Sequence, residues 1–245
     1  LSMMRTTFLI ILFFIFHSLS AQDKISKTDQ PLFFFGLHFS PDYSYRHLIN
    51  TDGQSVTQTV IRARDRIEKA RIGFTTGVSF GWNILSRIQI ESGLFYSAKG
   101  YKTNKELLVY FPPVSPGDPT AVKHVYRKKF LDIPFRVVYL WSGKRLQMAS
   151  SGGMVFNLFL NQVLLTYSYY ESGEVKKTIN RLQDDIRKIN LSVQLGMGLR
   201  YQLNDRLTLM AEPVLRYGLL NSADTPVAEK LWTAGLNTGV YFSFK

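Results

Sequence analysis

His38, Ser40 and Asp42 are the residue types of a hydrolase triad, and they occur at every second position. A triad needs successive hydrogen bonds between a serine oxygen, an imidazole and a carboxylate. If the segment is a β-strand, all three side chains share one face, but residues two apart are separated by roughly 6 to 7 Å. Because that spacing is too long for a relay of direct hydrogen bonds, we predict no catalytic site here.

The other histidines offer little more chemistry. His17 lies in an apolar N-terminal run, and His47 and His124 lie in predicted loops. A membrane hydrolase that uses His124 with a loop serine, Ser115 or Ser55, remains an alternative, although no base or orienting acid is placed beside them. The chain has no cysteine, which excludes disulfides and thiolate chemistry. We therefore expect no enzyme activity, no cofactor and no metal site.

A second set of candidates consists of charged side chains at the inward positions of predicted strands. They could form a charged track for ions or a substrate. The alternative, which we favour, is a paired network that fills a narrow lumen, because eight strands enclose only enough room for side chains. The set comprises Glu91, Asp132, Arg136, Arg200, Glu212 and Arg216.

The elements that position these residues are strands, because apolar and polar residues alternate with period two. In residues 189–203, every odd position is apolar and every even position is polar or glycine. Segments of roughly 10 to 15 residues are long for soluble proteins and sufficient for tilted membrane strands, which need about 9 to 11 residues. The eight predicted strands are 33–46, 71–83, 87–99, 131–141, 145–156, 189–203, 206–217 and 232–244.

Short and long connections alternate strictly along the chain. Hairpin-length turns occur at 84–86, 142–143 and 203–205. The long connections are 47–70, 101–125, 158–188 and 218–230. Outer-membrane barrels have short periplasmic turns and long extracellular loops. We predict an all-β protein, an eight-stranded antiparallel up-and-down transmembrane β-barrel with four long extracellular loops.

The apolar face could point inward, as in a soluble lipocalin-like barrel, or outward to lipid. Aromatic residues favour the second arrangement, because they collect near the two ends of the predicted strands, as in the girdles of membrane barrels. The predicted girdle includes Phe33, Phe35, Trp82, Tyr139, Trp141, Tyr201, Trp232, Phe242 and Phe244.

The first residues are typical of an export signal. Arg5 precedes the apolar run 8–16, and small residues follow at 18–21. The run has roughly half the length that a membrane-spanning helix needs. We predict a signal peptide at 1–21, a periplasmic segment at 22–32 and an outer-membrane barrel at 33–245; a soluble periplasmic domain is the alternative.

The formal net charge of +12 could indicate nucleic-acid binding. No zinc-finger, helix-turn-helix or RNA-binding motif frames the basic residues, so we expect no nucleic-acid partner. Anionic lipid headgroups or an acidic protein would suit the charge equally. For the basic stretch 62–71, contact with lipid headgroups and simple solvation both remain open.

Three prolines and one loop segment carry local predictions. Pro41, Pro134 and Pro213 lie inside predicted strands, where each removes a hydrogen-bond donor, so we expect β-bulges there. Residues 174–189 place isoleucine and leucine three to four apart, which predicts either a short amphipathic helix or a loop stabilised by its own packing.

Several segments resemble the PorT-type outer-membrane barrels found alongside type IX secretion. They are 92–101 (SGLFYSAKGY), 130–135 (FLDIPF), 198–207 (GLRYQLNDRL) and 211–213 (AEP). The ending 240–245 (VYFSFK) also resembles the C-terminal signal of barrel assembly, with Lys245 displacing the terminal aromatic. The resemblance implies an accessory protein needed for type IX secretion of cargo proteins.

Three functions follow from these patterns. The first is a non-enzymatic accessory or assembly component of secretion, located in the outer membrane with lipid and other secretion proteins as partners. The second is a small pore, or a barrel that binds lipid or another ligand. The third is a membrane-embedded hydrolase or acyltransferase. Conductance and histidine substitutions would separate the second and third from the first.

Overall fold

The alternating segments fold into one closed β-sheet. The computed structural model describes residues 32–111, 117–141, 143, 145–182, 186–223 and 225–244. Eight of its ten described strands form the barrel, and two short strands, β4 and β7, extend it. The barrel strands are β1 (Phe33–Asn50), β2 (Glu68–Leu85), β3 (Ile88–Thr103), β5 (Ala121–Leu140), β6 (Leu146–Tyr169), β8 (Ile189–Gln202), β9 (Leu207–Gly218) and β10 (Val227–Phe244).

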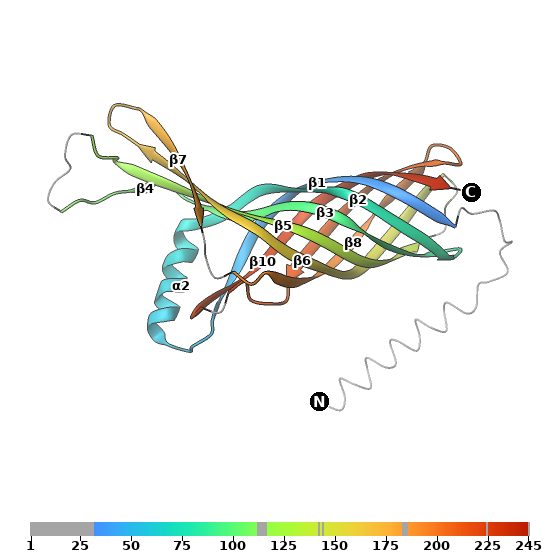
Figure 1. Cartoon of the computed structure of the whole chain (residues 1–245), viewed down its shortest axis with the longest axis horizontal. Coiled ribbons are helices and arrows are strands. Elements are labelled where there is room, and N and C mark those ends of the chain that lie inside the picture. Colours follow the sequence, from blue (N-terminus) through green and yellow to red (C-terminus); the bar gives the residue numbers. More distant parts are fainter. Residues whose placement is uncertain are drawn as a thin grey trace. The chain divides into compact units, whose positions relative to one another are not determined.

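Every neighbouring pair in the barrel is antiparallel, and one long-range pairing closes the ring. β1 pairs with β10, so the first and last strands meet, and β5 pairs with β6 to complete the circuit. Figure 1 shows the strands tilted around a common axis, with the end of β10 beside the start of β1. The predicted eight-stranded antiparallel barrel is confirmed.

The period-two pattern determines which side chains face the lumen. Along β1, exposed and buried residues alternate almost without interruption from Phe33 to Leu48. The exposed positions are mainly apolar, and the buried positions include His38, Asp42 and Arg46. This distribution is the reverse of a soluble protein, and it suits a surface that hydrocarbon covers.

The bulges predicted at the three prolines are absent, and this prediction was wrong. Pro41, Pro134 and Pro213 hold regular register positions opposite Phe74, Val155 and Leu236, respectively. Each strand residue directs its N–H toward only one neighbour, so a proline interrupts the ladder on one side alone. Accordingly, the pairing skips two residue pairs on the other side of each proline while the register continues unchanged.

Register shifts occur at other sites. They lie between Ala70 and Phe74 in β2, between Asn83 and Leu85 in β2, and at Lys129–Phe130 where β5 meets β6. The first and third lie toward the long-loop end of the barrel. Bulges bend and twist strands at such rims, where the sheet leaves its regular cylinder.

Two strands extend far beyond the barrel. β5 and β6 have 20 and 24 residues, and at their outer ends they pair with the short strands β4 (Glu106–Leu107) and β7 (Val175–Leu182). We call β4, β7 and the outer parts of β5 and β6 the extracellular ribbon; it projects from the end opposite the short turns (Figure 1). The long connection predicted at 158–188 is therefore largely strand, and the one at 101–125 is strand at 101–103, 106–107 and 121–125.

The amphipathic helix considered for residues 174–189 is absent from the described part of that segment. β7 occupies most of it, residues 183–185 lie outside the described residues, and Ile186 forms an isolated bridge with Ala223. A neighbouring strand supplies hydrogen bonds to this segment, and tertiary pairing overrides a helical spacing of apolar residues. Neither alternative, a short helix or a loop stabilised by its own packing, describes β7, which is a strand paired with β6.

A helix that the sequence did not predict lies in the first long connection. α2 (Ser55–Ile67) contacts β1, β2 and β10 at the outer end of the barrel. It buries Thr57 and Ile61, while Val56 and Val60 are exposed. No helix of the described chain is long and apolar enough to cross a membrane.

Two of the three predicted domains lie wholly or almost wholly outside the described residues. The predicted signal peptide, 1–21, and all but the last residue of the segment 22–32 lie outside the described residues. The described unit begins at Leu32 and contains the barrel, α2 and the extracellular ribbon.

Candidate functional site

The centre of the lumen is occupied by an arginine held between two carboxylates. Arg136 of β5 donates from Nη2 to Glu91 Oε1 at 2.9 Å and from Nη1 to Glu212 Oε2 at 2.7 Å. All three side chains are at most 4% exposed. Ser151 also donates to Glu212, at 2.6 Å. This bridge joins β3, β5, β6 and β9 across the lumen.

Arg200 of β8 extends the bridge toward the short-turn end. Its Nη2 lies 3.7 Å from Glu91 Oε2, and its Nη1 donates to Gln89 at 2.5 Å. The guanidinium also lies over the ring of Tyr241, 4.6 Å from the centroid, and the Tyr241 hydroxyl contacts Glu91 at 3.1 Å. Buried charges are tolerated only when paired in this way.

A second group of polar side chains lies around Asp42. Thr75 and Ser40 donate to its carboxylate at 2.5 and 2.7 Å, and Arg216 Nη1 approaches it at 3.2 Å. The contact from Ser40 corrects one expectation: residues two apart on a strand do bond here, because both side chains lean toward each other. His38 takes no part in that contact.

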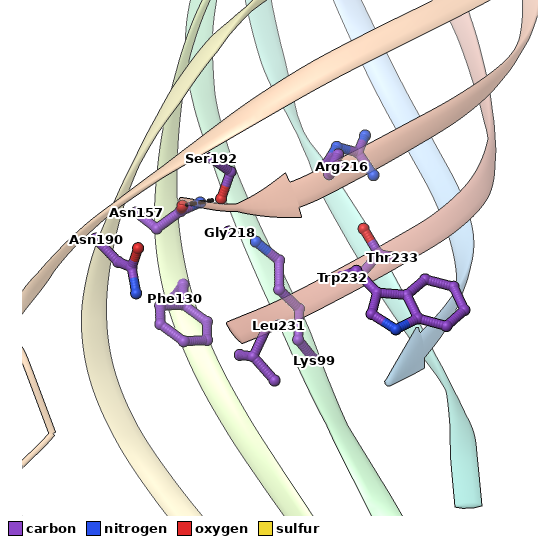
Figure 2. A pocket seen from close by; sticks show the side chains of 10 residues that line it. All are labelled: Lys99, Phe130, Asn157, Asn190, Ser192, Arg216, Gly218, Leu231, Trp232 and Thr233. Atoms are coloured by element: carbon purple, nitrogen blue, oxygen red, sulfur yellow. Dashed lines mark hydrogen bonds between the residues drawn. The ribbon is translucent and has the colours of Figure 1, made fainter. Parts of the chain in front are cut away.

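A third group, around Asp132, connects β3, β5, β6 and β8. Lys99 Nζ lies 2.8 Å from one carboxylate oxygen, and Asn157 donates to the other at 2.6 Å. Ser192 donates in turn to Asn157 (Figure 2). The structure thus places all six predicted lumen charges inside the barrel, each with a partner of opposite charge.

His38 lies next to a serine from the neighbouring strand. Its Nε2 is 2.7 Å from Ser79 Oγ, and the same nitrogen is 3.6 Å from Glu91 Oε1. In a catalytic triad the carboxylate holds the other ring nitrogen. Here His38 Nδ1 has no hydrogen-bond partner among the described residues, and both His38 and Ser79 are buried. Among the described residues, the pair therefore lacks the orienting acid of a triad.

The loop residues of the hydrolase alternative are not brought together. His124 Nδ1 lies 3.2 Å from Thr166 Oγ1 on the extracellular ribbon. Ser55 begins α2, His47 is exposed on β1, and Ser115 lies outside the described residues.

Apolar side chains close the short-turn end of the lumen. Phe34, Met210 and Tyr241 form one buried cluster there, with the rings of Phe34 and Tyr241 edge-to-face at 5.1 Å. Glycine provides the necessary space, since a Cβ on Gly81 would lie 2.0 Å from Phe34 Cζ.

The cavities described among these groups are small. Two cavities among these groups each have a volume of about 20 Å³. A cavity of this size holds about one water molecule. Figure 2 shows how side chains from several strands crowd one of them. The described residues contain no group of three or more histidine, aspartate or glutamate side chains suited to a metal.

Above the lumen, a charged cluster fastens α2 to the barrel. Glu68 accepts hydrogen bonds from Arg46 Nε at 2.6 Å and from Arg64 Nε at 2.7 Å. Arg64 also donates to the Tyr101 hydroxyl at 3.0 Å, and Arg46 to Asp65 at 2.9 Å. Burial disfavours the charge on Arg64, but the hydrogen bond with Glu68 raises its pKa, so the guanidinium stays charged.

An open cup of about 620 Å³ lies beside this cluster. Its wall includes the stacked rings of Tyr101 and Tyr126, whose centroids are 4.7 Å apart, and the ion pair between Lys128 and Glu229. Ser222, also in the wall, is 3% exposed. Sequence reasoning missed the cup, because its residues come from six separate segments, and which segments lie side by side is visible only in three dimensions.

The predicted girdle residues lie on the outer surface. Phe33, Trp82, Trp141, Tyr201 and Phe244 are 43–61% exposed. Phe35 and Phe242 are less so, at 36% and 38%, while Tyr139 and Trp232 are half-buried against neighbouring strands. Ser150 of β6 also faces outward, and its hydroxyl accepts a hydrogen bond from Trp141 Nε1 at 3.0 Å.

Comparison with known proteins agrees with this geometry. The model of the outer membrane protein beta-barrel domain matches residues 33–224. The chain belongs to this family. It is therefore an integral β-barrel of the outer membrane, and PorT itself is a finer assignment than the family match provides. No curated protein matches the sequence.

Solved structures of outer-membrane barrels resemble this chain, although their sequence identity to it is low. The Neisserial surface protein A matches with 12% identity and a TM-score of 0.46, over 86% of this chain and 97% of that one. The Thermus thermophilus major outer membrane protein matches with 10% identity and a TM-score of 0.44, over 86% and 99%. Pseudomonas aeruginosa OprG matches with 12% identity and a TM-score of 0.41, over 88% and 97%.

Proposed function

We propose that this outer-membrane barrel is a non-enzymatic, non-conducting accessory component of protein secretion, specifically type IX secretion of cargo proteins. The observation that carries the proposal is the filled lumen. The bridge of Glu91, Arg136 and Glu212 crosses it, and the neighbouring cavities hold about one water molecule each. A barrel without a passage acts through its outer surfaces and its loops.

The pore alternative has little support from this geometry. An ion would have to pass the bridge and then the cluster of Phe34, Met210 and Tyr241. Breaking a buried ion pair costs about 3–5 kcal/mol, so thermal motion seldom opens such a path. The hydrolase alternative also has little support: His124 Nδ1 lies beside Thr166 Oγ1, and His38 and Ser79, which do contact each other, are both buried.

The extracellular ribbon supplies a surface for a partner protein. Leu107 of β4 and two residues that follow this strand, Val109 and Phe111, are 79%, 96% and 103% exposed. Three large apolar side chains within five residues are unusual on a surface that contacts only water. Protein interfaces concentrate apolar and aromatic side chains of this kind at their centres. The secretion role itself is supported by the resemblance to PorT-type barrels.

Gene deletion and complementation test the proposal. We expect deletion to stop release of type IX cargo into the medium and the wild-type gene to restore it. A variant with Leu107→Ser, Val109→Ser and Phe111→Ser should insert normally but restore little secretion. The matched control, Val56→Ser with Val60→Ser, removes exposed apolar side chains from α2 and should restore secretion fully. Normal secretion in the deletion strain would refute the role.

A further inference from the structure

The acidic residues of the barrel strands are all turned inward. Among the described residues of the eight barrel strands, each aspartate and glutamate is at most 8% exposed. Six buried basic side chains accompany these six carboxylates, so the lumen is close to neutral. The acidic members are Asp42, Glu68, Glu91, Asp132, Glu212 and Glu229, and the basic members are Arg46, Lys99, Lys128, Arg136, Arg200 and Arg216.

Basic residues also occupy outward positions. None of the described acidic residues of the barrel strands lies on this outer side. Alternation places Lys69 of β2 and Lys102 of β3 outward, because Glu68, Tyr101 and Thr103 beside them are buried. The same alternation around the buried residues Lys128 and Phe130 places the neighbouring basic residues of β5 outward. We call this set the outer basic face: Lys69, Lys102, Lys123, Arg127 and Lys129.

The register brings these cations close together. Lys69 lies directly opposite Lys102, and Lys102 lies opposite Val125, between Lys123 and Arg127 on β5. Like charges directly opposite each other in an antiparallel pair are destabilising. In addition, Arg127 Nε is shielded from solvent and has no hydrogen-bond partner among the described residues. A negatively charged ligand would relieve the repulsion between Lys69 and Lys102 and could accept a hydrogen bond from Arg127 Nε.

The outer basic face begins where the lipid-facing surface ends. Phe39, Phe74 and Tyr96 form a row of rings on β1, β2 and β3, with centroid separations of 6.4 and 5.9 Å. Lys129 is the next outward position on β5 after Leu131, which pairs with Tyr96, and through Ala98 it lies level with Phe74 at the upper edge of this row. Aromatic rings in membrane barrels lie at the level of the headgroups. The cations therefore lie at or just above the outer headgroups.

We propose that the outer basic face binds the phosphate groups of an anionic lipid in the outer leaflet. The chemistry that fits is a phosphorylated headgroup whose acyl chains lie on the apolar surface below, against Phe74, Tyr96 and Leu131. The phosphates supply the negative charge that Lys69, Lys102 and Arg127 lack among the described residues. The bound lipid also fixes the height of the extracellular ribbon above the membrane, because β5 contributes residues to the outer basic face and to the ribbon.

Native mass spectrometry of the purified full-length protein in neutral detergent tests this site. Phosphatidic acid, phosphatidylcholine and inorganic phosphate are the probes. The test variant carries Lys69→Gln, Lys102→Gln, Arg127→Gln and Lys129→Gln. The control variant carries Arg62→Gln, Arg66→Gln, Lys176→Gln and Lys188→Gln, which remove as many exposed cations from other surfaces. Circular dichroism checks that both fold, and a milder pair, Lys102→Gln with Lys129→Gln, replaces the test variant if it does not.

We expect the wild type to retain phosphatidic acid about tenfold or more in preference to phosphatidylcholine, because each basic residue near a membrane surface adds appreciable attraction. The preference should disappear in the test variant, persist in the control variant and weaken as salt increases. Equal loss in both variants, or no preference in the wild type, would overturn the proposal. So would displacement of the lipid by inorganic phosphate at equal concentration, or by polyglutamate, which would indicate a free anion or an acidic protein instead.

Discussion

Arg136 is the residue on which most of the lumen network depends. It forms ion pairs with both Glu91 and Glu212 and also lies 3.1 Å from the Tyr241 hydroxyl. Removing one member of a buried charge network leaves its partners desolvated and unpaired. The carboxylates would then have to take up protons or water, in a space where the adjoining cavities hold about one molecule each.

The first prediction concerns Arg136→Met, which keeps the bulk of the side chain but removes its charge. We expect the free energy of unfolding to fall by about 3–5 kcal/mol, the usual cost of breaking a buried ion pair. Urea titration of the barrel in lipid vesicles, followed by tryptophan fluorescence, measures it. Arg145→Met, an exposed arginine at a short turn, is the control and should change stability little. Equal stability of the two variants would contradict a network that holds the lumen together.

The second prediction tests whether Ser79 has a catalytic role. Ser79→Ala should leave secretion in the complementation assay unchanged and lower stability by about 1 kcal/mol, the worth of an ordinary hydrogen bond. A fluorophosphonate probe should label neither protein, because Ser79 is inaccessible and its neighbour His38 lacks an orienting acid. Labelling of the wild type that disappears in Ser79→Ala would establish a reactive serine and refute the non-enzymatic proposal.

At the scale of elements, sequence reasoning was strongest where lipid imposes a pattern. Inside the membrane each strand must alternate, so the eight strands and the inward charges could be read from parity. Above the membrane that requirement ends. The outer parts of β5 and β6, together with β7, are therefore strands through pairing with neighbours, and their own alternation carries little information.

Which charged side chains of the lumen contact each other also could not be predicted from the sequence. That Glu91 and Arg136 face inward follows from alternation, but that they lie opposite each other depends on the register between β3 and β5. The contact of Arg136 with Glu212 depends further on the curvature that brings β9 across the lumen. Similarly, α2 begins after Gln54, whose side chain makes no capping hydrogen bond, so the usual start signal is missing.

The third prediction concerns the attachment of α2. Glu68→Gln removes the charge that both Arg46 and Arg64 contact, and hydrogen bonds to charged groups are worth about 1.5–3 kcal/mol. We expect amide hydrogen exchange in α2 to accelerate about tenfold or more, while exchange in β1 and β10 near the short turns stays slow. Asp65→Asn is the matched control: its side chain is 53% exposed, so loss of its contact with Arg46 should matter less. An equal effect of both variants would place the attachment elsewhere.

At the scale of the whole molecule, charge is separated between the inside and the outside of the barrel wall. The lumen pairs its six buried carboxylates with six buried cations, while the chain as a whole carries a formal net charge of +12. The surplus therefore lies outside the lumen, including the outer basic face. With this distribution, ion pairs connect the strands on the inside of the barrel. The positive charge on the outside attracts anionic surfaces.

The fourth prediction follows from the same separation, because a neutral, filled lumen should not conduct ions. In planar bilayers we expect no unitary current steps from the wild type over a range of voltages, with a general porin in the same membrane as a check of sensitivity. A charged track would behave differently: Glu91 and Glu212 would attract cations, and Glu91→Gln with Glu212→Gln would shift ion selectivity. In a plugged barrel that variant loses stability, since Arg136 loses both charged partners, yet it gains no selective current. Reproducible steps in the wild type whose cation preference falls in the variant would show that ions pass the bridge and that the barrel is a channel.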